Sequence, residues 1–169
     1  MLNNDLSQQI KRNFPYKPTE EQENAVICFA VFLFSPSADS VFLMKGYAGT
    51  GKTTLTSALV RTLDSLQRKV ILLAPTGRAA KVFSGYAEHP AYTIHKKIYR
   101  QNVYSNETDN FVANQNLHRN TLFIVDEASM IANEGLSGGH FGSGRLLDDL
   151  VQYVYNGLGC RLMLIGDTA

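Results

Sequence analysis

Two stretches of the sequence carry residues whose types and spacing suit phosphate chemistry. The first, GYAGTGKT at residues 46–53, fits the pattern G-x-x-x-x-G-K-[ST] without a mismatch. In this pattern the glycines let backbone N–H groups approach phosphate oxygens, and the following helix presents its positive end. The stretch lies between an apolar run and a segment with helical spacing, so it is expected at a strand-to-helix turn. A glycine-rich turn without a ligand is the alternative interpretation.

The residues of this turn have separate predicted roles. Lys52 is expected to reach the β- and γ-phosphates, and the hydroxyl of Thr53 to ligate Mg²⁺. The residues of the turn expected to bind the nucleotide are Gly46, Ala48, Gly49, Thr50, Gly51, Lys52, Thr53 and Thr54. The expected cofactors are therefore ATP and Mg²⁺.

The second stretch, LFIVDEAS at residues 122–129, ends an apolar run with two carboxylates. Ligands of open α/β sheets bind at the carboxyl ends of the strands. We therefore expect Asp126 to hold Mg²⁺ through water and Glu127 to act as general base, which makes both catalytic together with Lys52. The turn and this acidic tip are expected to lie on neighbouring strands. Alternatively, the two carboxylates only begin a helix, where negative charge is favourable.

The elements that must position these residues alternate between apolar runs and helical patterns. Strands are predicted at VFLMKG, KVILLAP, NTLFIVDEAS and RLMLIG. Helices are predicted from Thr19 through the apolar run 25–34, from the GKT turn onwards, and within TGRAAKVFSGYA, YTIHKKIY and RLLDDLVQYVYN. Continuous apolar strands that alternate with helices indicate a mostly parallel sheet covered on both faces. The predicted fold is thus α/β, with residues 1–169 as a single domain.

Local signals refine this picture. Thr19 is a good N-cap, and Gln22 falls at the reach-back position of a capping box. The last helix is expected to bury Leu146, Leu147, Leu150, Val151 and Val154. Residues 100–119 are predicted to form a loop or hairpin, and the glycine-rich residues 133–144 to be mobile.

Composition excludes several classes of protein. The 16 Lys and Arg residues nearly balance the 15 Asp and Glu residues, so any contact with phosphates must be local. The apolar run 25–34 is too short for a membrane span, which takes about 20 residues. With no signal peptide in view, we expect a cytoplasmic protein without a membrane partner. Cys28 and Cys160 are expected to be reduced thiols in the core.

The order of motifs resembles that of a known family. PTEEQ, GYAGTGKTT, APTGRAAKVF, TIHKKIY, VDEASM and LIGDTA are similar to the consecutive motifs of the first motor domain of superfamily 1 DNA helicases. The similarity is closest to the 5′-to-3′ group that contains the RecD-like subunit of exodeoxyribonuclease V, and it spans about residues 14–169. It implies a RecA-like P-loop NTPase domain of an ATP-driven DNA helicase. The partners it implies are single-stranded DNA, a second RecA-like domain, and other recombination or repair subunits.

The resemblance also gives roles to particular residues. The glutamine of the first motif reads adenine in the family, a role that falls on Gln22 beside its alternative in the capping box. The positions implied to contact single-stranded DNA are Pro75, Thr76, Gly77, Arg78, Thr93, His95 and Lys96. Backbone N–H groups and hydroxyls can bind phosphates without reading sequence. The alternatives are helix N-caps for Thr76 and Thr93, a solvated face for Lys96, and an ordinary surface or core histidine for His95.

The last motif is matched only at its opening, GDTA at residues 166–169. In the family a glutamine that senses the γ-phosphate follows, and then a second domain that donates arginines to the cleft. We therefore expect residues 1–169 to be one motor half, which binds Mg·ATP but does not unwind DNA. A small-molecule P-loop kinase and a non-catalytic nucleotide-binding module of a recombination complex are the alternatives. A kinase would need a lid with arginines, for which residues 100–119 are the candidate.

Overall fold

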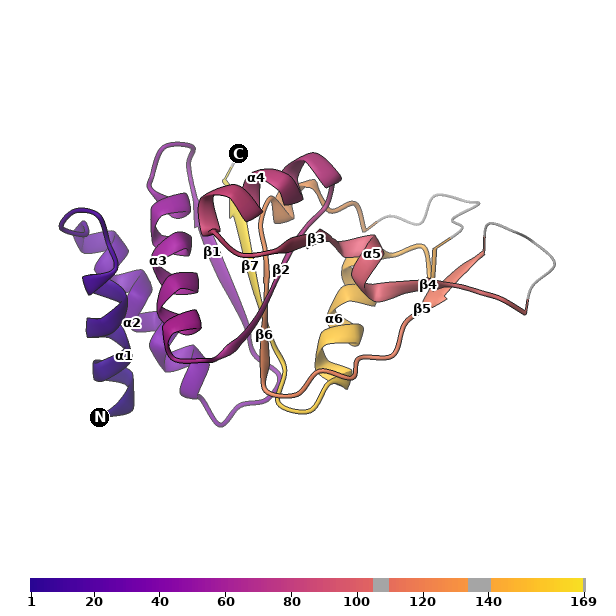
Figure 1. Ribbon diagram of the computed structural model, residues 1–169, viewed down its shortest axis with the longest axis horizontal. Helices are drawn as coiled ribbons and strands as arrows, with labels where there is room; N and C mark the ends of the chain where they lie inside the picture. The colour runs from indigo at the N-terminus through magenta and orange to yellow at the C-terminus, as the bar shows by residue number, and fades with distance from the viewer. Residues whose placement is uncertain (105–109, 134–140, 169) are drawn as a thin grey trace.

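A parallel β-sheet runs through the chain in the computed structural model (Figure 1). The structure describes residues 1–104, 110–133 and 141–168. The five-stranded sheet has the order β1-β7-β6-β2-β3, and each neighbouring pair is parallel. Its strands are β1 (Val41–Gly46), β2 (Lys69–Ala74), β3 (Ala91–Thr93), β6 (Thr121–Val125) and β7 (Arg161–Asp167). The predicted α/β fold with a mostly parallel sheet is confirmed.

Helices cover both faces of this sheet. One face carries α1 (Leu2–Arg12), α2 (Glu20–Phe34), α3 (Lys52–Ser65) and α4 (Gly77–Ala87). The other face carries α5 (Ile94–Ile98), α6 (Leu146–Asn156) and the short helix η1 (Ala128–Met130). The predicted covering of both faces is therefore confirmed as well.

An antiparallel hairpin, β4 (Tyr99–Gln101) with β5 (Phe111–Ala113), follows α5. It lies at the end of the molecule away from α1 and α2 (Figure 1). The prediction of a loop or hairpin over residues 100–119 is confirmed by these strands. Residues 105–109, between them, lie outside the described part of the chain.

The central strand β6 shows why the strands are largely apolar. Leu122 and Ile124 belong to the core shared with α1–α4, whereas Phe123 and Val125 belong to the core shared with α5 and α6. Successive side chains point to opposite faces, and both faces are covered, so the four positions from Leu122 to Val125 are all apolar. Each fully buried large apolar side chain contributes about 1.5–3 kcal/mol.

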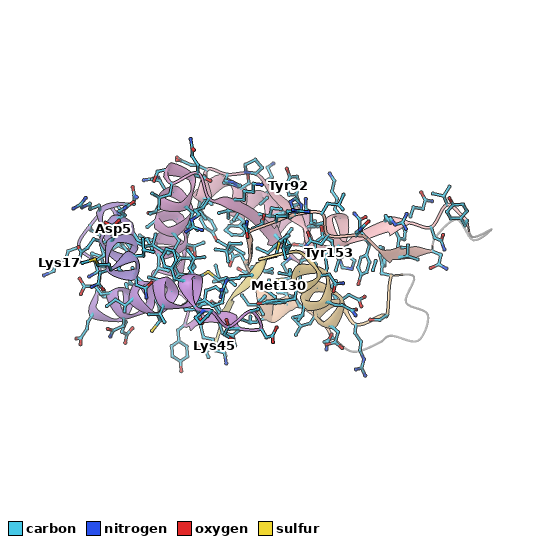
Figure 2. All side chains as sticks on the ribbon, turned by 90° about the horizontal axis from the view of Figure 1, so that it is seen from below. Asp5, Lys17, Lys45, Tyr92, Met130 and Tyr153 are labelled. Atoms are coloured by element: carbon cyan, nitrogen blue, oxygen red, sulfur yellow. The ribbon has the colours of Figure 1, made fainter. Side chains whose placement is uncertain are left out.

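The two edge strands, β1 and β3, are less buried than the strands between them. Figure 2 shows Lys45 of β1 and Tyr92 of β3 on opposite sides of the molecule, as the strand order requires. Strand β3 is missing from the sequence prediction, which begins a helix within YTIHKKIY. A strand of three residues is too short to show an alternating pattern, and the observed helix begins only at Ile94.

Helix α6 differs in detail from its prediction. Leu150 and Val154 are buried as expected, together with Tyr153. The side chains predicted to be buried that remain partly exposed are Leu146, Leu147 and Val151. The buried face of α6 is therefore narrower than the run of apolar residues suggests.

The prediction of mobility for residues 133–144 falls mainly on residues 134–140, which lie outside the described part.

The cysteines are both free, as expected, but only Cys160 is buried. Cys28 is exposed because α2 turns Val26, Phe29 and Ala30 inward and leaves position 28 on its outer face. The expectation that both thiols lie in the core is therefore wrong for Cys28. Within the described residues, no helix is both long and apolar enough to cross a membrane.

The start of α2 gives a first testable prediction. Thr19 accepts a hydrogen bond from the Gln22 backbone N–H at 3.2 Å, and the Gln22 side chain accepts one from the Thr19 N–H at 3.0 Å. We expect Thr19→Ala to lower the free energy of unfolding by about 1 kcal/mol, because one N–H loses its partner. Urea unfolding followed by circular dichroism measures this, with Thr19→Ser as a control that keeps the hydroxyl. Equal stability of the Ala and Ser variants would contradict the prediction.

Candidate nucleotide-binding site

The glycine-rich turn lies between β1 and α3, where the sequence predicts it. Gly49 and Gly51 have φ angles of 80° and 82°, a left-handed conformation that favours glycine. Gly51 is also the N-cap of α3 and has no side chain to occupy the first N–H groups of the helix. Those N–H groups and the positive end of α3 are thus available to phosphate oxygens.

The Lys52 ammonium is held by three oxygen atoms. It donates to the carbonyls of Gly46 at 2.9 Å and Tyr47 at 2.8 Å, and it forms an ion pair with Asp167 at 2.7 Å. The lysine side chain is 15% exposed, so its charge needs such partners. A phosphate that binds at the turn would compete with Asp167 for this ammonium.

The strand order corrects one expectation. The turn after β1 and the acidic tip after β6 are not on neighbouring strands, because β7 lies between them. This position brings Asp167, at the end of β7, between the turn and Asp126. Chain order does not reveal spatial order in a parallel sheet, since the crossover connections can skip a position.

Asp126 is fixed at both carboxylate oxygens. Its Oδ2 accepts a hydrogen bond from the Tyr86 hydroxyl at 2.6 Å, and its Oδ1 accepts one from the Glu127 N–H at 2.8 Å. Its own N–H donates to the carbonyl of Leu73 at 3.0 Å, which anchors the tip to β2. Burial, followed by the bond to Asp126, raises the pKa of Tyr86 well above its usual range, so this hydroxyl remains a donor.

Glu127 has an unusual backbone and an unusual environment. Its φ of 54° places it in the left-handed region, which is uncommon for a residue other than glycine. Burial raises the pKa of Glu127, the nearby charges of Asp126 and Asp167 raise it further, and Lys52 opposes the shift. A carboxylate with a raised pKa in a cleft suits the task of a general base.

These groups line one cavity of about 480 Å³ at the carboxyl ends of the strands. The lining residues are Tyr16, Ala48, Gly49, Gly51, Lys52, Thr53, Thr54, Tyr86, Asp126, Glu127, Ile165, Gly166 and Asp167. Lys52, Asp126 and Glu127, predicted to be catalytic, are thus brought together. A second cavity of about 660 Å³ lies at the amino ends of the strands, where Arg161 already donates to three backbone carbonyls.

The donor set fits Mg²⁺ carried by a nucleotide. Within the described residues, no cluster of three or more His, Cys, Asp or Glu side chains forms a metal site by itself. Mg²⁺ usually keeps several waters and takes one or two protein oxygens together with phosphate oxygens. The carboxylate of Asp126 and the hydroxyl of Thr53, which line the same cavity, match this need.

Gln22 takes part in the capping box that was its alternative role. Its Oε1 accepts from Thr19, and its Nε2 lies so near Gly51 that a Cβ atom there would collide with it. The buried side chain therefore contacts both the start of α2 and the phosphate turn. Its role in reading adenine stays a prediction.

The residues predicted to contact DNA follow β2 and β3, at the same edge of the sheet as the cavity. Thr76 accepts from the Ala79 N–H at 3.1 Å, and Thr93 accepts from the Lys96 N–H at 3.2 Å, so both are helix N-caps. The exposed members of this group are Thr76, Gly77, Arg78 and Lys96, whereas Pro75, Thr93 and His95 are partly buried. Their contact with DNA stays a prediction.

His95 is packed among aromatic rings. The centroid of its ring lies 4.9 Å from that of Phe141, in an edge-to-face arrangement, and 5.7 Å from that of Tyr99. Burial lowers the pKa of His95, which favours the neutral imidazole at pH 7. The alternative of a histidine used for packing therefore describes its surroundings in the structure.

Five lining residues of the cavity were not assigned to the site from the sequence: Tyr16, Tyr86, Ile165, Gly166 and Asp167. Asp167 carries a signal that points to the site, since it follows the apolar run RLMLIG and so comes at the carboxyl end of a strand. Tyr86 lies inside an amphipathic helix, where nothing in the local sequence separates it from a packing residue. Tyr16 lies in the segment between α1 and α2 and is 53% exposed.

A parallel α/β sheet with a glycine-rich turn after β1, a lysine at the start of α3 and carboxylates at the strand ends defines a P-loop nucleotide-binding domain. The profile of the AAA domain family matches residues 19–169, and the chain belongs to this family. The chain is also similar to the multifunctional conjugation protein TraI of Escherichia coli strain K12 and to the protein of the same name from Escherichia coli. Each is 32% identical over 108 residues, which is 60% of this chain and 6% of the relative. The chain thus spans a small part of these relatives.

The raised pKa of Glu127 gives a testable prediction. Folding raises the pKa of this carboxyl group above its ordinary value of 4.5. Such a group destabilises the folded state when the pH rises past its pKa, because the folded protein then holds a charge that the unfolded chain accommodates more easily. We expect Glu127→Gln to raise the melting temperature at pH 7 by at most about 1–2 °C, because Glu127 is exposed and its charge is screened by solvent, and the difference to shrink near pH 3, where the carboxyl group is mostly protonated. Thermal unfolding at the two pH values measures this. A Gln variant that is less stable at pH 7, or a gap that does not change with pH, would contradict it.

Proposed function

We propose that residues 1–169 form the ATP-binding half of an ATP-dependent 5′-to-3′ DNA helicase of the RecD-like group. The observation that carries this proposal is the meeting of Lys52, Asp126, Glu127 and Asp167 in one cavity, at the same sheet edge as the starts of α4 and α5. The family and the conjugation relatives support a nucleotide-binding domain. The direction of travel and the RecD-like group rest on the resemblance of the motifs.

In this proposal each residue of the cavity has one task. Lys52 exchanges Asp167 for the β- and γ-phosphates, and the N–H groups of the turn bind the remaining phosphate oxygens. Thr53 and Asp126 hold Mg²⁺, which when bound neutralises the charge of the phosphates. Glu127 takes a proton from the attacking water, for which its raised pKa suits it.

The proposed DNA path runs over the ends of β2 and β3. The starts of α4 and α5 present N–H groups, and Arg78 and Lys96 add positive charge at exposed positions. Such contacts bind phosphates without reading bases. The further partners we propose are a second RecA-like domain that supplies arginines to the cleft, and subunits of a repair, recombination or conjugation complex.

The phosphate turn provides the decisive test. We expect Lys52→Ala to abolish detectable binding of Mg·ATP in a fluorescent-nucleotide titration, because a partly buried cation that faces the phosphates is lost. Lys69→Ala, at the opposite end of β2, is the matched control and should bind normally.

A steady-state ATPase assay with single-stranded DNA should show little turnover by residues 1–169. Strong DNA-stimulated turnover would show that no second domain is needed.

The proposed DNA path is tested at Arg78. We expect Arg78→Ala to weaken binding to single-stranded oligonucleotides to a similar degree for different sequences. The slope of log affinity against log salt should fall by about 0.7, the value for one phosphate contact on a single strand. Fluorescence anisotropy at several salt concentrations measures both. Arg68→Ala, an exposed arginine at the other end of the sheet, is the control, and an equal effect of the two variants would contradict the path.

A further inference from the structure

We propose that Tyr86 is a positioning residue for the metal-binding carboxylate, and that it links this carboxylate to the DNA-facing helix α4. The inference rests on the proposed function, since it takes Asp126 as a Mg²⁺ ligand. It starts from the hydrogen bond of 2.6 Å between the Tyr86 hydroxyl and Asp126 Oδ2. These two residues are 40 positions apart in the chain and lie on different elements.

The ring of Tyr86 is held in place by its own packing. It lies 5.3 Å from the ring of Phe83, which is fully buried, and it packs against the core shared by α1–α4. The carbonyl of Tyr86 accepts a hydrogen bond from Ser57 Oγ of α3 at 3.1 Å. Tyr86 therefore joins three parts of the site: the helix that follows the phosphate turn, helix α4 and the tip of β6.

Packing alone does not require the hydroxyl. A phenylalanine would fill the same place against Phe83, whereas only a tyrosine can also donate to Asp126. Oδ1 of Asp126 is bound by the adjacent Glu127 N–H, and Oδ2 by Tyr86, so the hydroxyl fixes the rotation of the carboxylate. Groups that hold a metal ligand in orientation commonly matter about 10- to 100-fold for metal affinity.

The position of Tyr86 on α4 connects the proposed DNA contact at the start of this helix to the carboxylate of Asp126. Helix α4 begins at Gly77, next to the proposed DNA contact Arg78, and Tyr86 lies in its last turn. The helix has 11 residues and so is about 16 Å long, and it joins these two positions directly. Figure 1 shows α4 crossing the end of the sheet where β7 ends. A shift of α4 on DNA binding would therefore move the hydroxyl that holds Asp126.

The chain offers a matched control for this bond. Tyr99 donates to Asp149 Oδ2, also at 2.6 Å, and Asp149 is bound in addition by Ser143. This pair ties β4 to α6, and neither residue lines the nucleotide cavity. Tyr99→Phe removes the same chemical group from a tyrosine-carboxylate pair that the nucleotide does not reach.

The experiment compares wild type, Tyr86→Phe and Tyr99→Phe by titration with fluorescent ADP, with and without Mg²⁺. The affinity for ADP without Mg²⁺ is measured for each variant as its own reference, because Tyr86 lines the cavity and its loss can also change the binding of free ADP. The gain in affinity on adding Mg²⁺ should fall about tenfold in Tyr86→Phe and stay at the wild-type value in Tyr99→Phe. Single-stranded DNA should also change the Mg·ADP affinity less in Tyr86→Phe than in the wild type.

The outcomes separate this inference from the proposed function. A full gain on adding Mg²⁺ in Tyr86→Phe, with normal binding by the wild type, overturns the inference and leaves the function standing. An equal loss of the gain in both variants also overturns it, because a general loss of stability then explains the result. If the wild type binds no ADP, the proposed function fails, and the inference fails with it. An unaltered effect of DNA in Tyr86→Phe overturns the link through α4.

Discussion

Because the five strands run parallel, every residue that follows a strand lies at the same edge of the sheet. This constraint brings together groups that are far apart in the chain: the phosphate turn after β1, Asp126 after β6 and Asp167 at the end of β7. The parallel arrangement in turn requires helices on both faces, since its strands are apolar on both sides. The two cores therefore hold these groups in place at the sheet edge.

Negative charges outnumber positive charges at this edge of the sheet, and this excess affects which ligand the cavity can bind. Asp126, Glu127 and Asp167 face a single cavity in which Lys52 is the one cation among the described lining residues. Three carboxylates would repel a bare triphosphate, so the cavity favours a nucleotide that brings a cation with it. Burial raises the pKa of Glu127, and the negative charges of Asp126 and Asp167 raise it further.

Local signals in the sequence predict the local parts of the structure. The place of the glycine-rich turn between a strand and a helix, the capping box of α2 and the apolar strands each depend on residues close together in the chain, and each is found where the sequence predicts it. The insertion of β7 between β1 and β6 depends on long-range pairing, which no short pattern encodes. Strand β3 is defined by its pairing with β2 over three residues, and the bond between Tyr86 and Asp126 spans 40 positions. Neither feature can be predicted from the neighbouring residues in the sequence.

Structural and functional roles need not exclude each other at the capped helix starts. The Thr76 hydroxyl accepts from the Ala79 N–H, which is the third residue of α4. This bond leaves the N–H groups of Gly77 and Arg78 pointing out of the first turn, and these are the groups that a phosphate would bind. The two polar atoms of the Gln22 side chain likewise have separate contacts: Oε1 takes part in the capping box, and Nε2 lies beside Gly51. A cap that orders a helix start therefore prepares a binding surface, so finding the cap does not argue against the ligand.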